Sequence, residues 1–70
     1  MDELKVLIKQ NVEGDSNTTL QKVSNILKDN IDINSLITWI KINSVARNLK
    51  PDEVLNMASR IKTTRLQVNI

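Results

Sequence analysis

Ile31-Asp32-Ile33-Asn34-Ser35-Leu36-Ile37-Thr38-Trp39-Ile40-Lys41-Ile42-Asn43-Ser44-Val45-Ala46-Arg47-Asn48-Leu49 is the most apolar stretch of this chain and contains its only aromatic residue. At about 100° per residue on a helix, its apolar side chains fall into two groups on opposite sides. One group is Ile33, Leu36, Ile37 and Ile40, and the other is Trp39, Ile42, Val45, Ala46 and Leu49. Because a surface helix needs only one apolar stripe, this pattern predicts a helix that is enclosed on both sides, interrupted, or bound to a partner.

We expect this stretch to form one continuous helix from Asp32, as the N-cap residue, towards Asn48. Asn43 and Ser44 lie between the two apolar groups, and both are weak helix formers that can end one helix and cap the next. A break at these two residues is therefore the alternative.

Two helices precede this stretch. Leu4, Leu7 and Ile8 are spaced as on one helix face, which predicts a first helix up to about Val12. Gly14 suits the end of that helix because glycine adopts positive φ without steric cost. Thr18 and Gln21 have the spacing of a capping box, and they predict that the second helix begins there and runs to about residue 29.

Lys50-Pro51-Asp52-Glu53 predicts the start of a fourth helix. Proline is preorganised for the first helical position, and the two carboxylates complement the positive end of the helix dipole. Residues 65–70 then alternate apolar and polar side chains, which is typical of a strand. A flexible tail or a continuation of the helix is the favoured alternative for this segment.

The chain has 70 residues and lacks cysteine, which predicts a single small domain over residues 1–70 without disulfides. The fold class is all-α, a compact bundle of four short helices. A core of this size is only marginally stable, so the bundle either stands alone or shares its core with a second copy in a dimer.

Several classes of function are excluded by what the sequence lacks. Without His and Cys, the commonest general base and the commonest metal ligands are missing, so we expect no enzyme, no cofactor and no metal. No apolar run approaches the ~20 residues that span a bilayer, and the acidic start lacks the features of a secretory signal. We expect a cytoplasmic protein without a membrane partner, and its abundance of Asn and Ile favours a phage or plasmid-like source.

The net charge of +2 conceals an asymmetry, because residues 1–40 are acidic on balance and residues 41–70 are basic. A basic half can bind the phosphates of duplex DNA. The candidate DNA contacts are Lys41, Arg47, Lys50, Arg60, Lys62 and Arg65. Neither register tested for a helix-turn-helix fits well, since Lys50 stands where glycine is usual in one and Asp29 takes a buried position in the other.

Asn34-Ser35-Leu36 resembles the phosphopantetheine attachment motif of acyl and peptidyl carrier proteins. The resemblance covers these three residues, with Asn34 in place of the usual Asp, and it implies Ser35 as the site of a prosthetic group. The alternative, which we favour, is that Ser35 is an ordinary residue of a helix first turn.

These patterns lead to a ranked set of functions. The first is a small non-enzymatic regulatory or adaptor protein that self-associates or binds another protein. Its interface would consist of Trp39, Ile42, Val45, Ala46 and Leu49. The second is a dimeric DNA-binding regulator that uses the basic residues given above, and the third is a carrier-like protein modified at Ser35.

Overall fold

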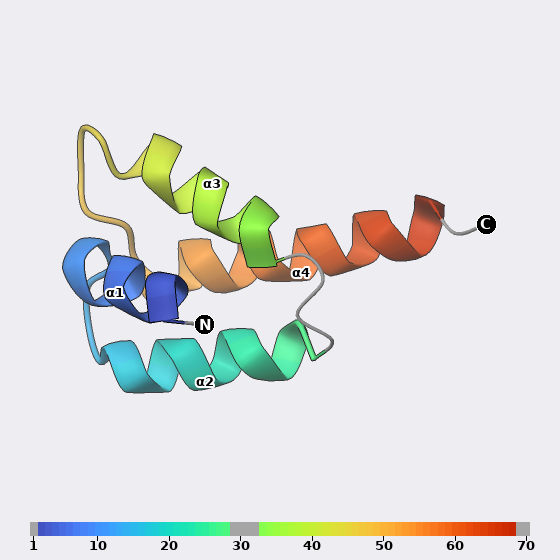
Figure 1. Cartoon of the computed structure of the whole chain (residues 1–70), viewed down its shortest axis with the longest axis horizontal. Helices are drawn as coiled ribbons and strands as arrows, with labels where there is room; N and C mark the ends of the chain where they lie inside the picture. Colours follow the sequence, from blue (N-terminus) through green and yellow to red (C-terminus); the bar gives the residue numbers. More distant parts are fainter. Residues whose placement is uncertain (1, 29–32, 69–70) are drawn as a thin grey trace.

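Four α-helices form a ring in which each helix packs against two others (Figure 1). The structure is a computed structural model, and it describes residues 2–28 and 33–68. α1 and α4 lie diagonally across the ring, and α2 and α3 each contact both of them. The helices are α1 (Asp2–Asn11), α2 (Ser16–Ile26), α3 (Ile33–Asn43) and α4 (Pro51–Val68). The prediction of an all-α bundle of four helices is confirmed.

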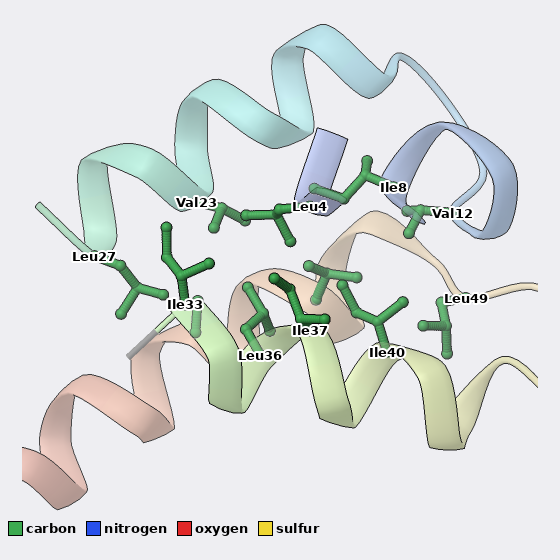
Figure 2. Packing of buried hydrophobic residues seen from close by; sticks show 12 residues of the cluster. Leu4, Ile8, Val12, Val23, Leu27, Ile33, Leu36, Ile37, Ile40 and Leu49 are labelled. Carbon is green, nitrogen blue, oxygen red and sulfur yellow. The ribbon is translucent and has the colours of Figure 1, made fainter. Parts of the chain in front are cut away.

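The core of the bundle is aliphatic and is built around one face of α3. Its side chains meet those of α1 and α2 in the centre of the ring (Figure 2). Leu36 and Ile40 are fully buried, as are Leu4 and Ile8 of α1 and Val23 of α2. The first apolar group of the sequence is Ile33, Leu36, Ile37 and Ile40, and all four residues are buried as predicted.

α3 ends at Asn43, so the expected continuous helix towards Asn48 is wrong. The side-chain amide of Asn43 donates a hydrogen bond of 2.8 Å to the carbonyl of Trp39. Asn11 ends α1 in the same way, donating 3.0 Å to the carbonyl of Leu7. Asparagine competes well for backbone partners at helix ends, and the alternative of a break at Asn43 and Ser44 is the observed one.

Leu49 ties the connection between α3 and α4 to the end of α1. Its backbone N–H donates 2.8 Å to the carbonyl of Asn11, and its carbonyl accepts 2.8 Å from the N–H of Glu13. These bonds form an isolated parallel bridge between Val12 and Leu49. The Leu49 side chain is fully buried in the core. The connection therefore passes round the end of the bundle beside α1 as a fixed segment (Figure 1).

The turn between α1 and α2 differs from its predicted form at the start of α2. Asp15 is the N-cap, and its carboxylate accepts hydrogen bonds from the N–H of Asn17 and from the hydroxyl of Thr18. The predicted capping box of Thr18 and Gln21 is wrong, because Asp15 satisfies the free N–H groups one turn earlier. α2 also ends earlier than predicted, at Ile26, with the N–H of Leu27 bonded to the carbonyl of Val23.

α4 begins at Pro51 as predicted and continues to Val68. Residues 65–68 are therefore helical, and the strand-like interpretation of the tail is wrong for these four. With 18 residues, α4 is longer than the other helices, and its C-terminal end extends past them (Figure 1). The predicted N-cap Asp32 and the last two residues of the tail, Asn69 and Ile70, lie outside the described residues.

No helix within the described ranges combines the length and apolar character that are needed to cross a bilayer.

Truncation of the α3 core face tests the packing. We expect Leu36→Ala to lower the free energy of unfolding by about 2–5 kcal/mol, because it removes a fully buried side chain and leaves a cavity. Ile42→Ala is the matched control on the same helix, since Ile42 is 67% exposed. Urea denaturation at low protein concentration measures both. Equal losses for the two variants would contradict this assignment of the core face.

Gly14 has a φ of 87°, in the left-handed region. A Cβ at this position would lie 3.4 Å from Cγ of Pro51, in ordinary contact, so the cost of a substitution comes mainly from the backbone. We expect Gly14→Ala to lower the free energy of unfolding by about 1–2 kcal/mol. Gly14→Asn is the control, because asparagine tolerates this conformation better, and the same denaturation experiment should show a smaller loss for it.

Candidate interaction surface

Two large apolar side chains are exposed where α3 ends. Ile42 is 67% exposed and Val45 is 84% exposed, and Ala46 beside them is also exposed. Among the residues whose side chains the structure describes, Val6 of α1 is the other large apolar side chain in this class. Leaving such a side chain in water forgoes about 1.5–3 kcal/mol of burial free energy. Two of them within four positions mark this end of α3 as the candidate site.

Trp39 lies next to Ile42 on the helix surface, because residues three apart are neighbours on an α-helix. Its side chain is partly buried and packs against the core. Part of this side chain therefore contacts the core, and the remainder is accessible to solvent or to a partner. We call Trp39, Ile42, Val45 and Ala46 the apolar surface.

Leu49 does not belong to this surface. It was predicted to share one helix face with the other four residues, but α3 ends six residues before it. Its side chain is fully buried and its backbone is bonded to the end of α1. A partner could reach Leu49 only by opening the bundle.

An ion pair holds the segment that carries Val45 and Ala46. The Arg47 guanidinium donates two parallel hydrogen bonds to the Glu53 carboxylate, with Nη1 2.8 Å from Oε2 and Nη2 2.7 Å from Oε1. The backbone N–H of Lys50 also donates 2.8 Å to Glu53 Oε2. Glu53 thus caps the start of α4 from its third position, in the manner of a capping box. Bidentate pairs of this kind fix geometry as well as charge.

A second ion pair lies at the other edge of the apolar surface. Lys41 Nζ is 2.7 Å from Oε2 of Glu3 on α1. Both side chains are more than half exposed, so the pair contributes little stability in water. It does place a carboxylate beside the cation that directly precedes Ile42.

The candidate DNA contacts lie in two parts of the chain, one around the α3–α4 connection and the other along α4. Lys41, Arg47 and Lys50 surround the α3–α4 connection, and the first two are engaged with carboxylates. Arg60 is about 15 Å further along α4 than Lys50, at a rise of about 1.5 Å per residue. Lys62 is rotated by about 200° from Arg60 around the helix axis. Arg65 is part of α4, but its side chain lies outside the description.

A shallow pocket of about 210 Å³ lies between the starts of α2 and α4. It is smaller than the ~300–1,000 Å³ of typical small-molecule sites. The lining residues are Asp15, Thr18, Thr19 and Lys22 on one side and Pro51, Asp52 and Leu55 on the other. Asp15 and Thr18 are bonded to each other as part of the α2 cap, so the polar groups of this pocket already have a structural role.

Ser35 is exposed in the first turn of α3, as its ordinary interpretation predicts. Attachment of a prosthetic group there stays a prediction. Across residues 2–28 and 33–68, no group of three or more acidic side chains is arranged to hold a metal ion.

Comparison with protein families, with characterised proteins and with solved structures gives no match to this chain.

Two residues of the site were not singled out from the sequence. Glu53 was expected only to complement a helix dipole, and Glu3 was given no role. The spacing of Pro51 and Glu53, at the first and third helical positions, is the signal that could have indicated the capping role of Glu53. Nothing in the sequence indicates the pairing of Glu3 with Lys41, because it depends on the packing of α1 against α3.

The Arg47–Glu53 pair predicts a loss of stability in acid. The bidentate bond from Arg47, with the N–H of Lys50, lowers the pKa of Glu53 to about 2. A pKa that folding lowers contributes stability above the pKa of the unfolded chain, and this contribution is lost as pH falls towards the folded value. We expect the melting temperature of the wild type to fall between about pH 4.5 and 2, and Glu53→Gln to reduce that fall.

The Thr18 hydroxyl lowers the pKa of Asp15 as well, so part of the acid sensitivity should persist in Glu53→Gln. Glu13→Gln is the matched control, because its side chain is exposed and the substitution leaves both Asp15 and Glu53 in place. Thermal unfolding followed by circular dichroism across this pH range measures the effect. A pH dependence in Glu53→Gln identical to that of Glu13→Gln would exclude the role assigned to the ion pair.

Proposed function

We propose that this chain is a small non-enzymatic regulatory or adaptor protein that acts by binding another protein through its apolar surface. The observation that supports this most is the exposure of Ile42 and Val45, at 67% and 84%, beside the half-buried Trp39. Exposed apolar patches beyond a few hundred Å² usually mark sites of association. Tryptophan is also over-represented among residues that dominate binding energy.

The way in which this surface is held supports the same proposal. Val45 and Ala46 lie between two fixed points, the end of α3 and the buried Leu49. The N–H of Ser44 still bonds the carbonyl of Ile40 at 3.0 Å, and Arg47 is clamped to Glu53. A surface that is already ordered loses less conformational entropy on binding.

The lack of His and Cys, which removes the commonest general base and the commonest nucleophilic thiol, favours a binding role over catalysis. DNA binding has less support than protein binding. Lys41 and Arg47 would have to give up carboxylate partners at 2.7 Å to contact phosphates. Arg60 and Lys62 lie about 200° apart around α4, so these two do not share one face.

Site-specific photocrosslinking in the source cells tests the proposal. Val45 is replaced by benzoylphenylalanine, and the matched control carries the same group at Asn56, which is exposed on the outward face of α4. We expect a discrete covalent adduct at position 45 only, because this side chain is the one that a partner would bury. Mass spectrometry identifies the adduct, including a second copy of this chain.

A second variant distinguishes specific binding through the apolar surface from nonspecific crosslinking by the aromatic probe. Adding Ile42→Lys to the position-45 probe places a charge in the apolar surface and should abolish the adduct. Identical adducts at positions 45 and 56, or an adduct that survives Ile42→Lys, would contradict binding through this surface.

A further inference from the structure

An ion pair lies at each end of residues 42–46, the part of the chain that carries Ile42, Val45 and Ala46 of the apolar surface. Lys41 directly precedes Ile42 and is paired with Glu3, whereas Arg47 directly follows Ala46 and is paired with Glu53. Residues 41–70 are basic on balance, yet each cation at these edges has a carboxylate at 2.7 Å. The edges of the apolar surface therefore present both signs of charge side by side.

We propose that the partner of this surface is a second copy of this chain, related by a two-fold axis. The inference rests on the proposed function and identifies its partner. A two-fold interface brings one surface against itself, so that surface has to be complementary to itself. Here the apolar side chains can meet their own copies, and Lys41 of one chain can meet Glu3 of the partner subunit.

The charge pattern favours a second copy over other occupants. A strongly acidic partner, including nucleic acid, gains little from cations that are already paired, and a basic partner meets paired carboxylates. Opposite charges arranged to complement one another mainly provide specificity. Positive and negative charges lie side by side at the edges of the apolar surface and balance one another. Such an edge is complementary to a second copy of itself.

The area required by a stable dimer includes these ion pairs. Specific interfaces bury about 800 Å² on each partner, which is roughly a sixth of the 4771 Å² accessible surface of this chain. Four apolar side chains, one of them half-buried, cover only part of such an area. The contact has to extend beyond them, and the inference places Lys41 and Glu3, which are paired and exposed next to Ile42, in that extension. A domain of this size also gains stability from association.

A charge-swap experiment on purified protein tests the inference. Light scattering and sedimentation equilibrium over a concentration series should show a dimer for the wild type. Glu3→Lys and Lys41→Glu should each weaken the dimer by about tenfold or more, because like charges meet across the axis. The double variant Glu3→Lys/Lys41→Glu should restore it, since both signs are exchanged together.

Mixing the two single variants separates contacts between chains from contacts within one chain. Each single variant loses its internal ion pair, and mixing cannot repair that defect. A heterodimer, however, sets the two lysines of the Glu3→Lys chain against the two carboxylates of the Lys41→Glu chain, which restores both contacts across the axis. With one variant isotopically labelled and the two mixed in equal amounts, native mass spectrometry should show the heterodimer at well over twice the level of either homodimer, twice being the ratio that random pairing gives. Circular dichroism verifies that each variant is folded.

Three results would overturn the inference: a wild type that is monomeric up to about 1 mM, a mixture whose heterodimer does not exceed the level given by random pairing, or a dimer that persists in Val45→Lys. A monomer that still crosslinks through position 45 to another protein leaves the proposed function standing and removes only the second copy as its partner. A monomer without a position-specific adduct removes both.

Discussion

The structure depends on the attachment of Leu49 to the end of α1. Two backbone hydrogen bonds of 2.8 Å join Leu49 to Asn11 and Glu13, and the Leu49 side chain is fully buried. This attachment satisfies backbone groups at the end of α1 that have no partner within the helix. It also determines where the chain turns back, because Pro51 begins α4 two residues later. The α3–α4 connection therefore helps to hold the four helices together, in addition to the packing of helix on helix.

Much of the fold could be predicted from local signals. The period of Ile33, Leu36, Ile37 and Ile40 predicted the buried face of α3, and Pro51 predicted the start of α4, because each signal acts within one or two turns of helix. The end of α3 could not be predicted from such local signals. Val45, Ala46 and Leu49 continue the helical period, but the bridge of Leu49 to Val12 joins residues 37 positions apart, and this pairing overrides the period.

The candidate site was predicted in part, for the same reason. Trp39, Ile42, Val45 and Ala46 are close in sequence, and none of the four belongs to the buried core. Leu49 does not belong to this surface, because its side chain is buried and its backbone is bonded to the end of α1. The carboxylates at the edges, Glu3 and Glu53, come from α1 and α4. Their roles follow from helix packing and from the cap of α4, so the chemistry of the edges becomes visible only in the structure.

The break in α3 links folding to the proposed association. In one continuous helix, Val45 and Leu49 would share a face, and both would be available to a partner or both would be enclosed. The break separates them, so that Leu49 enters the core and Val45 is presented to solvent between the clamp of Arg47 and the end of α3. Substitutions on the outer side, at Ile42 or Val45, can then change association while the core is kept. Substitutions at Leu49 must change both, because the position of the exposed segment depends on its burial.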